Sequence, residues 1–491
     1  MAKAEFLAFD LGAESGRGVL GIFEQNKLRL TELHRFPNGP VKIMGHLHWN
    51  ILRLYEEIKK TMSLCARQYS KQLQGIGLDT WGVDFGFVGR NNTLIGFPYA
   101  YRDKRTDGMM ELVFQRMPRE EIYQRTGIQF MQLNSLFQLY SMVLEKSPIL
   151  EAADRLLFMP DLFNFLLTGV KATEFTIATT SQLYDPRKKT WCDEIFSRLE
   201  LPRHLMPEIS PPGTIVGPLL GDIAEETGLE SVPVIATASH DTGSAVAAVP
   251  ASGADWAYLS SGTWSLLGIE VQEPIINEQS LAFDLTNEGG VEGTFRFLKN
   301  IMGLWLIQEC RRQWEREGEA LDYEAITWLA AQARAFVAFV DPDHPSFLHP
   351  ENMPEAIISF IEKTGQPRPS DKGELLRCVL ESLALKYKFT LDMLDKIRGK
   401  PTQVLHIVGG GSRNQLLCQL TANAIGRPVI AGPAEATAIG NLAVQAVTKG
   451  VLSSIKDARK MIRDSFDLVT YEPQEADAWL EAYDRFAKII E

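Results

Sequence analysis

The stretch Val232–Val246, VPVIATASHDTGSAV, has the pattern of a buried strand that turns directly into a helix. Its apolar start, up to Ile235, is typical of a buried strand. The small residues after Asp241 predict that a helix opens there. Asp241 therefore stands at a strand-to-helix corner, where the positive end of the helix dipole predicts an ionised carboxylate that can accept a proton. The alternative is that Asp241 or Ser239 only caps the helix.

Length and composition indicate an ordinary globular protein. A chain of 491 residues is too long for one core and predicts two or three domains. Hydrophobic residues make up 45% of the chain and charged residues 23%, and the net charge of −12 argues against nucleic acid as a partner. The five cysteines are scattered without a CxxC pair, which predicts a reducing environment and no zinc site.

The N-terminus MAKAEFLAFDLG leads straight into a predicted strand and lacks the apolar region of a signal peptide. No apolar run in the sequence approaches the length that spans a bilayer. We therefore expect a cytoplasmic protein with no membrane partner.

A glycine turn lies between two predicted strands near the N-terminus. Gly16, Gly18 and Gly21 satisfy GxGxxG, but that dinucleotide-binding fingerprint requires a helix after the glycines, and a β-rich run follows here. The segment is therefore predicted to be a hairpin, whose turn can offer backbone N–H groups to a phosphate, with Arg17 adding further donors. Asp10, at the end of the first strand, could hold a magnesium ion through water. The alternative is a plain glycine hairpin.

The segment Gly75–Phe85, GIGLDTWGVDF, predicts a strand that ends near Trp81, Gly82 and Asp84. An aromatic ring and a carboxylate beside bare backbone suit a sugar, while the alternative is a buried tryptophan next to a turn. The charged segment Tyr101–Asp107 is predicted to be a solvated face.

Three segments that follow have less specific patterns. The block Pro118–Gly169 is apolar with helical spacing and predicts a helical insertion. The polar segment Thr173–Pro186 comes next, and Trp191–Leu199 predicts a short helix.

The segment Ala257–Glu270 repeats the design of the N-terminus, with a strand, a small polar turn and a second strand. This indicates a duplication of architecture, with Thr263 offering a hydroxyl and an N–H at the second turn. Two such turns can bind a polyphosphate. Leu298–Gln308 is predicted to open a helix, with Asn300 near its start and Gln308 on it. The segment Ala248–Gly253 is the best candidate boundary between domains.

The C-terminal part predicts a long helix from Asp371 to Gly399 and then a strand over Val404–Val408. The strand runs into Gly409–Asn414, GGGSRN, where glycines allow a ring or a phosphate to approach the backbone ahead of a helix N-terminus. Ala434–Ala443 predicts a small-residue helix that can pack closely, and amphipathic helix follows toward the C-terminus.

No GxxxxGK[ST] motif is present, so the sequence excludes a P-loop nucleotide site. The ordered segments DLGAESGR, LDTWGVD, SHDTGSAV, SSGTWSL, VGGGSRN and AEATAIGN resemble those of the FGGY carbohydrate kinases of the actin/hexokinase/Hsp70 superfamily. Within that family, DTWGVDFG, YRDKRTDGM and FMPDLFNFLLTG are most similar to the kinases that act on L-rhamnulose. The resemblance implies an α/β fold, with two actin-like (ribonuclease H-like) domains around a central cleft and helical insertions. It implies a sugar-side domain over residues 1–250, a nucleotide-side domain over 251–450, and a helical tail, 451–491, packed on the second domain.

The resemblance also implies a reaction, in which the γ-phosphate of MgATP passes to the C1 hydroxyl of L-rhamnulose. The implied partners are a small ketose and ATP, the implied cofactor is Mg²⁺, and a monomer or weak homodimer is expected. Asp241 would be the general base. The sugar would contact Gly82, His240, Asp241, Thr242 and Asn300; the nucleotide would contact Ala13, Glu14, Ser15, Gly16, Arg17, Thr263, Gln308 and Gly410; and Asp10 would hold the metal through water.

Two alternatives remain open at the level of sequence. One is a kinase for a related ketose such as L-fuculose or L-xylulose. The other is an ATP-gated actin-like binding protein, a chaperone or a filament former. Asp241 beside the expected sugar site favours a kinase.

Overall fold

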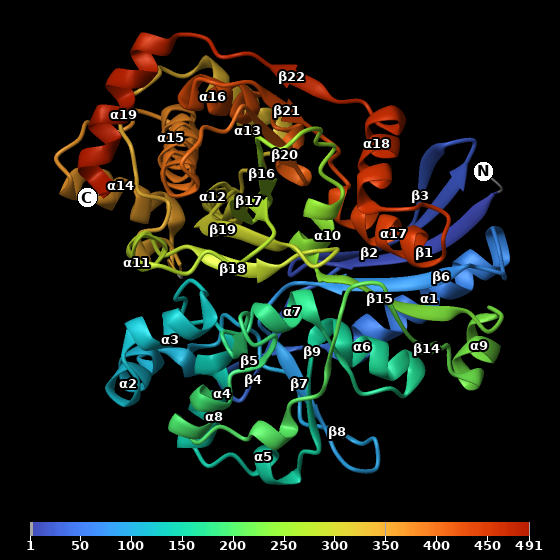
Figure 1. Cartoon of the computed structure of the whole chain (residues 1–491). Helices are drawn as coiled ribbons and strands as arrows, with labels where there is room; N and C mark the ends of the chain where they lie inside the picture. Colours follow the sequence, from blue (N-terminus) through green and yellow to red (C-terminus); the bar gives the residue numbers. More distant parts are fainter. Residues whose placement is uncertain (1–2, 349, 491) are drawn as a thin grey trace. The chain divides into compact units, whose positions relative to one another are not determined.

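The structure, a computed structural model, describes residues 3–348 and 350–490 and consists of two compact units (Figure 1). The first unit contains residues 1–250, 270–297 and 436–465; the second contains 251–269, 298–435 and 466–491. The chain thus enters each unit more than once. Within the last forty residues, α18 (Ile455–Ser465) groups with the first unit and α19 (Ala476–Ile490) with the second.

The first unit is built on a six-stranded sheet with the order β14-β15-β6-β1-β2-β3. These strands are β1 (Ala4–Leu11), β2 (Ser15–Glu24), β3 (Lys27–Pro37), β6 (Gly75–Thr80), β14 (Thr214–Pro218) and β15 (Pro233–His240). β1, β6 and β15 are parallel neighbours, whereas β2, β3 and β14 run antiparallel to the strands beside them. The carboxyl ends of the three parallel strands therefore meet at one edge of the sheet, where open α/β sheets bind ligands.

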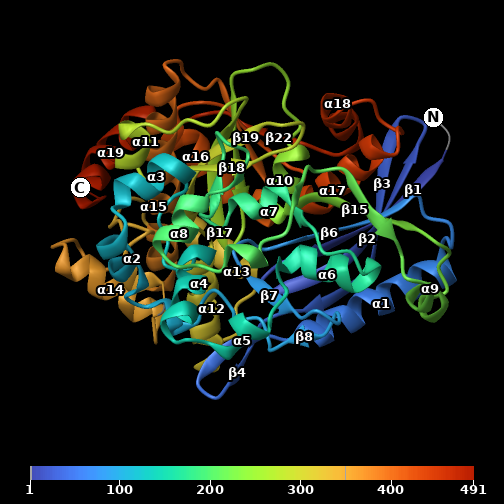
Figure 2. The same ribbon diagram turned by 60° about the horizontal axis from the view of Figure 1, so that its bottom comes forward.

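Helices cover both faces of this sheet (Figure 1). On one face, α1 (Ile51–Gln68) and α6 (Met159–Thr168) share a core with β1 and β6, and the Asn50 side chain caps α1 by accepting the Arg53 N–H. On the other face, α17 (Ala436–Thr448) packs so closely that a Cβ on Gly21 would lie 2.6 Å from Leu442. Figure 2 shows α9 (Gly221–Thr227) lying along α1.

The predicted helical insertion is present but contains a strand that the sequence analysis missed. Helices α3 (Arg119–Thr126), α4 (Ser135–Leu144) and α5 (Pro148–Ala152) share a core with the small sheet β8-β7-β9. The prediction of helix throughout was wrong at β9 (Arg155–Phe158), which pairs with β7 (Phe85–Val88). Pairing with a strand some seventy residues away overrides a local apolar pattern that fits either element.

The segment predicted only as polar, Thr173–Pro186, is also ordered. It contains β10 (Thr173–Glu174), α7 (Phe175–Thr179) and β11 (Tyr184–Asp185), and most of its side chains are buried. Its polar groups are used in hydrogen bonds inside the unit, so a polar sequence here forms an interior network.

The second unit is built on strands in the order β19-β17-β16-β20-β21-β22. They are β16 (Trp256–Ser261), β17 (Trp264–Val271), β19 (Phe295–Met302), β20 (Val404–Val408), β21 (Val429–Ala431) and β22 (Val469–Tyr471). The prediction of a helix from Leu298 was wrong, because Asn300 lies on β19 and α12 (Trp305–Arg316) begins only after Gly303. β22 was also missed.

The pairings in the two units follow the same pattern. A glycine-turn hairpin, β1-β2 or β16-β17, comes first, and its first strand pairs in parallel with a later strand, β6 or β20. The next strand, β15 or β21, is again parallel, and β14 or β22 closes the series antiparallel. The predicted duplication of architecture is thereby confirmed.

The remaining elements complete the two units. In the first they are β4 (Pro40–Ile43), β5 (His46–Trp49), β8 (Leu94–Ile95), α2 (Met109–Arg116), β12 (Thr190–Trp191), α8 (Asp193–Arg198), β13 (Ile209–Ser210), α10 (Asp241–Ala247), α11 (Glu278–Ala282) and β18 (Thr286–Gly289). In the second they are α13 (Tyr323–Gln332), α14 (Met353–Lys363), α15 (Lys372–Arg398) and α16 (Gln415–Ile425). Among the residues described, no helix is long and apolar enough to span a membrane.

Candidate active site

Three aspartates gather at the carboxyl ends of the parallel strands in the first unit. Asp10 lies next to the last residue of β1, Asp79 is its direct partner on β6, and Asp241 begins α10 immediately after β15. The strand-to-helix corner predicted from the sequence is confirmed. Asp241 is not the N-cap, since that position is His240, and Ser239 donates its hydroxyl to Thr237. The capping alternative is therefore wrong for both residues.

Asp241 is a carboxylate whose proton affinity is increased by its surroundings. Burial, together with the nearby charge of Asp10, raises the pKa of Asp241, although His240 and Thr242 act in the opposite direction. The positive end of the helix dipole therefore does not keep the pKa of Asp241 low, contrary to the expectation from the sequence. The side chain keeps 30% of its exposure, and Oδ1 accepts the Thr242 N–H at 2.5 Å and its hydroxyl at 3.1 Å. A positioned carboxylate with a raised pKa suits a general base.

Asp79 was quoted within a motif but given no role in the sequence analysis. It is fully buried; its Oδ2 accepts from the Asn441 amide at 2.6 Å, and its Oδ1 has no hydrogen-bond partner among residues 3–348 and 350–490. Burial raises the pKa of Asp79 well above its usual value, and the charges of Asp10 and Asp241 add to that effect. The signal that could have found it is its position near the end of the strand predicted within Gly75–Phe85, since the carboxyl ends of parallel strands meet at one edge of a sheet.

Asp10 and Arg17 form an ion pair across the predicted phosphate hairpin. They face each other in the register of β1 and β2, and the Arg17 guanidinium donates twice to Asp10 Oδ2, at 2.5 and 2.9 Å. Asp10, predicted to hold the metal, and Arg17, predicted to bind phosphate, are therefore bonded to each other in this structure. An arriving phosphate can compete for the same guanidinium.

The turn of this hairpin is tight. The Gly12 N–H donates to the Ser15 carbonyl at 2.9 Å, and the Asn38 N–H donates to the Glu14 carbonyl at 2.8 Å. A side chain at Gly16 would place its Cβ 2.3 Å from the Phe36 ring, so only glycine fits there. Ala13 lies in the turn, partly exposed.

Gly82 and His240 lie against each other in the first unit. A Cβ on Gly82 would be 3.3 Å from His240 Nε2, and the same imidazole nitrogen lies 3.4 Å from Asp241 Oδ1. Three residues predicted to contact a sugar, Gly82, His240 and Thr242, are therefore grouped around the carboxylate that would act as the base.

Trp81 and Asp84, considered as a sugar-binding pair, are instead part of the interior. Asp84 is fully buried and accepts from Trp49 Nε1, Trp81 Nε1, the Tyr101 N–H and Gln138 Nε2. Burial raises the pKa of Asp84 to about 6. Three of these donors reach Oδ2 and one reaches Oδ1, so the carboxylate is used inside the protein and the buried-tryptophan alternative is the correct one.

The charged loop after Tyr101 is not merely a solvated face. Arg105 donates to the Gln138 carbonyl at 2.9 Å and to its amide oxygen at 2.7 Å, and its guanidinium stacks over the Tyr99 ring. The Gln138 side chain thus bridges Arg105 to Asp84, which ties this loop to α4 and to β7.

In the second unit, hydrogen bonds link the turn that carries Thr263 to the start of the helix that carries Gln308. The Thr263 carbonyl accepts from the Gly303 and Trp305 N–H groups at 3.1 and 3.2 Å, which fixes the β16–β17 turn to the start of α12. Gln308 lies one turn along that helix, and its buried Oε1 has no hydrogen-bond partner in the part of the chain that the structure describes. Asn300 lies on β19, the strand leading to the same helix.

Gly410 follows β20, whose carboxyl end lies beside that of β16. Its neighbour Gly409 has a left-handed φ of +83°, and a Cβ on Gly411 would lie 2.0 Å from Ser261 Oγ. Nothing within 4 Å opposes a Cβ on Gly410 itself, so this turn is open at that residue. The glycines let the turn approach the end of β16.

Comparison with known proteins identifies the family. Residues 6–248 match the N-terminal domain of the FGGY family of carbohydrate kinases, and residues 257–448 match its C-terminal domain. The chain belongs to the FGGY family of carbohydrate kinases. It is 46% identical over 488 residues to a rhamnulokinase of Bacteroides thetaiotaomicron, covering 99% of this chain and all of that protein. It is 42% identical over 465 residues to a rhamnulokinase of Halalkalibacterium halodurans, covering 95% and 98% of the two chains.

Solved structures agree with the FGGY fold. A ligand-bound xylulose kinase of Lactobacillus acidophilus superimposes with a TM-score of 0.82 at 16% identity, over 99% of this chain and 97% of that one. A glycerol kinase of Plasmodium falciparum with ADP gives 0.78 at 14% identity, over 99% and 98%. The predictions of the family, the α/β two-domain fold and a sugar phosphotransferase are confirmed.

The residues of this FGGY kinase include acidic oxygens suited to a hard divalent cation. In the described part of the chain, no three acidic, histidine or cysteine side chains are arranged to hold a metal directly. Mg²⁺ commonly keeps several waters and takes only one or two carboxylates with substrate phosphates. The unpartnered Asp79 Oδ1, beside Asp10, fits that kind of site.

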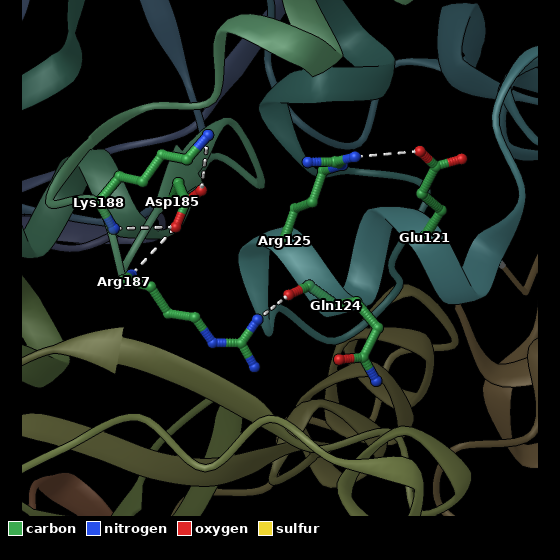
Figure 3. Close-up of a pocket in the computed structure, with 6 residues that line it drawn as sticks. All are labelled: Glu121, Gln124, Arg125, Asp185, Arg187 and Lys188. Atoms are coloured by element: carbon green, nitrogen blue, oxygen red, sulfur yellow. Dashed lines mark hydrogen bonds and ion pairs between the residues drawn. The ribbon is translucent and has the colours of Figure 1, made fainter.

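A separate surface cavity of about 360 Å³ in the first unit was not predicted (Figure 3). It is lined by Glu121, Gln124, Arg125, Asp185, Arg187 and Lys188. Figure 3 shows Arg125 directed at Glu121, and Arg187 directed at the Gln124 carbonyl, to which it donates at 2.6 Å. The cavity contains none of the predicted site residues of the FGGY kinase.

Proposed function

We propose that this FGGY kinase transfers the γ-phosphate of MgATP to the C1 hydroxyl of L-rhamnulose, giving L-rhamnulose 1-phosphate and ADP. The observation that carries the proposal is the 46% identity, over nearly the whole chain, to a protein named rhamnulokinase. The grouping of Gly82, His240 and Thr242 around Asp241 supports it, because it places hydroxyl-binding groups beside a carboxylate base.

In this proposal Asp241 accepts the proton of the C1 hydroxyl as the oxygen attacks the γ-phosphorus. The bond from that phosphorus to the β–γ bridging oxygen breaks, and ADP leaves with the electron pair. Phosphoryl transfer depends mainly on positioning and charge stabilisation. His240, Thr242, Gly82 and Asn300 would orient the sugar hydroxyls.

The nucleotide would be bound by backbone and side chains of Ala13, Glu14, Ser15, Gly16 and Arg17, and by Thr263, Gln308 and Gly410. A bound Mg²⁺ ion would offset negative charge on the phosphates. Asp10, through water, would hold it, and Asp79 adds a second carboxylate at that position. In our proposal Arg17 exchanges its bond to Asp10 for a bond to phosphate.

The functional division stays a prediction, with the sugar on residues 1–250, the nucleotide on 251–450 and a helical tail over 451–491. A cytoplasmic location and a monomer or weak homodimer are likewise predictions. Sedimentation with and without ATP tests the oligomeric state and also the filament-forming alternative.

The deciding experiment is a coupled assay of ADP release with L-rhamnulose, L-fuculose, L-xylulose or no sugar. We expect kcat/KM to be largest with L-rhamnulose and ADP release without sugar to be small. A larger kcat/KM with L-fuculose or L-xylulose would replace the proposed substrate. ADP release that no ketose stimulates would reject the kinase assignment for this panel. Mass spectrometry of the product identifies the phosphorylated carbon.

A further inference from the structure

A buried chain of polar side chains leads from β18 and β19 to Asp241. It begins at Glu288 on β18 and Arg296 on β19, continues through His240, and ends at the Asp241 carboxylate. All four residues belong to the first unit, which includes residues 295–297 at the start of β19. None of the roles given above uses Glu288 or Arg296, and neither was singled out in the sequence.

Arg296 is a completely buried cation whose three guanidinium nitrogens lie next to three different groups. Its Nε donates to the Gly289 carbonyl at 2.8 Å, its Nη1 lies 3.1 Å from Glu288 Oε2, and its Nη2 lies 3.1 Å from His240 Nδ1. Burying a guanidinium is costly unless a carboxylate and hydrogen bonds compensate it. Glu288 supplies the opposite charge, so the pair as a whole is neutral.

The contact with His240 decides where the imidazole proton lies. A guanidinium can only donate, so Nδ1 must accept, and the single proton of a neutral ring is then on Nε2. That nitrogen lies 3.4 Å from Asp241 Oδ1 and borders Gly82. Glu288 Oε2, 3.2 Å from Nδ1, would on its own favour a proton there, but Arg296 occupies the same region and balances its charge.

We propose that Arg296 is a positioning residue that holds His240 as the Nε2–H tautomer, so that the ring donates toward Asp241 and the adjacent sugar hydroxyl. Glu288 serves to balance the charge of Arg296. The role in turnover rests on the proposed function of Asp241 as the base. The tautomer assignment rests on the contacts that Arg296 and Glu288 make around Nδ1, and it does not depend on the role of Asp241.

The tautomer can be measured on the wild-type protein itself. The chain has 8 histidines. Long-range ¹H–¹⁵N correlation spectra of the full-length protein, labelled at histidine and recorded at neutral pH, distinguish the two tautomers and the imidazolium. A His240→Gln sample identifies the His240 signals. We expect a protonated Nε2 and a bare Nδ1. An Nδ1–H ring or an imidazolium at neutral pH would overturn the proposal.

Kinetics test whether the positioning matters. In Arg296→Met we expect kcat with sugar and ATP to fall roughly 10- to 100-fold, by analogy with the loss caused by removing a group that orients a metal-bound histidine. We expect the KM for ATP to stay near its wild-type value. Arg296→Lys keeps a charged donor and should recover part of kcat. A wild-type kcat in Arg296→Met, or no recovery in Arg296→Lys, would contradict the proposal.

A matched control separates positioning from stability. Arg377 on α15 also holds a buried partner, since its Nε lies 2.6 Å from Glu381 Oε1. We expect Arg377→Met to lower the melting temperature, as we also expect of Arg296→Met, but to leave kcat unchanged. An equal loss of kcat in both variants would show a stability effect only. If Arg296→Met does not fold, the wild-type spectrum still decides about the tautomer.

The two proposals fail in different ways. A wild-type protein that phosphorylates no ketose, yet shows the Nε2–H ring, contradicts the proposed function and keeps the tautomer assignment. A wild-type protein active on L-rhamnulose whose His240 carries its proton on Nδ1 keeps the function and rejects the role of Arg296.

Discussion

Asp79 on β6 is the direct register partner of Asp10 on β1, so two carboxylates from strands about seventy residues apart lie side by side. Like charges on neighbouring strands oppose each other, and burial adds to the cost of ionising Asp79. An arrangement that raises the pKa of grouped carboxyls is typical of functional sites, because it favours the binding of a proton or a cation. This edge of the first sheet is therefore where we place the chemistry.

The first prediction concerns the base. Asp241→Asn should keep the fold and ATP binding but lose on the order of 10²- to 10⁴-fold in kcat, the usual contribution of a positioned base. Steady-state ADP release measures kcat, and nucleotide titration measures ATP affinity. Asp193→Asn, at a side chain that is 77% exposed, is the control and should be fully active. A near-wild-type rate in Asp241→Asn would remove Asp241 from the mechanism.

The second prediction concerns pH. Because burial and the charge of Asp10 raise the pKa of Asp241, the acid limb of kcat should lie at higher pH than an exposed aspartate would give. The base must be unprotonated, so kcat should fall as pH drops through that raised pKa. Asp10→Asn removes the like charge and should move the limb to lower pH, whatever its effect on the maximum rate. If the acid limb of kcat lies at the same pH in Asp10→Asn as in the wild type, measured in the same buffers, this electrostatic account is wrong.

The third prediction separates structure from sugar binding at Asp84. Its Oδ1 and Oδ2 accept four donors, and Asn can replace only one of these oxygens, so Asp84→Asn should cost about 1–3 kcal/mol of unfolding free energy. The pKa of Asp84 is raised to about 6, so the folded state retains this proton more tightly. As the pH rises from about 4 to about 6, the unfolding free energy of the wild type should therefore fall, partly because the folded state holds this proton in a range where the unfolded chain has already lost it.

Denaturant titration across that pH range measures both effects at Asp84. In Asp84→Asn we expect a shallower slope against pH and a KM for the sugar within a few-fold of wild type. Unchanged stability together with a large rise in that KM would mean that Asp84 does bind the sugar.

The fourth prediction concerns the second hairpin. Thr263→Ala removes the hydroxyl but keeps the carbonyl that accepts from Gly303 and Trp305, so the turn should keep its shape. We expect lower kcat and kcat/KM for ATP with little change in sugar affinity. Initial rates at varied ATP and varied sugar measure both. A large loss of sugar affinity with unchanged turnover would contradict the assignment of Thr263 to the nucleotide.

The fifth prediction tests the packing of the small-residue helix. A Cβ on Gly440 of α17 would lie 1.7 Å from the Ser244 carbonyl on α10, and no side-chain rotation relieves a backbone contact. Gly440→Ala should therefore destabilise the protein by about 1–3 kcal/mol or more, measured by thermal and denaturant unfolding. Gly221→Ala, on α9 with open space at the Cβ, is the control and should be neutral or slightly stabilising. Equal effects at both positions would show that close packing is not the cause.

The local units of this protein can be predicted from residues that are close together in the chain. The strand-to-helix corner at Asp241, the hairpins around Gly16 and Thr263, and the strand before Gly409 are set by residues that are neighbours in the chain. Apolar runs, glycines and helix-opening small residues act over a few positions, so their pattern can be interpreted without the fold. The motifs in their order also indicated the family.

Which side chains those units bring together depends on the folded structure. It placed Asp79 beside Asp10, buried Asp84 among four donors, and set Arg296 behind His240. It also made Asn300 part of a strand. Strand pairing, burial and the charge around a side chain depend on segments far apart in the chain, and no local pattern of residues contains that information.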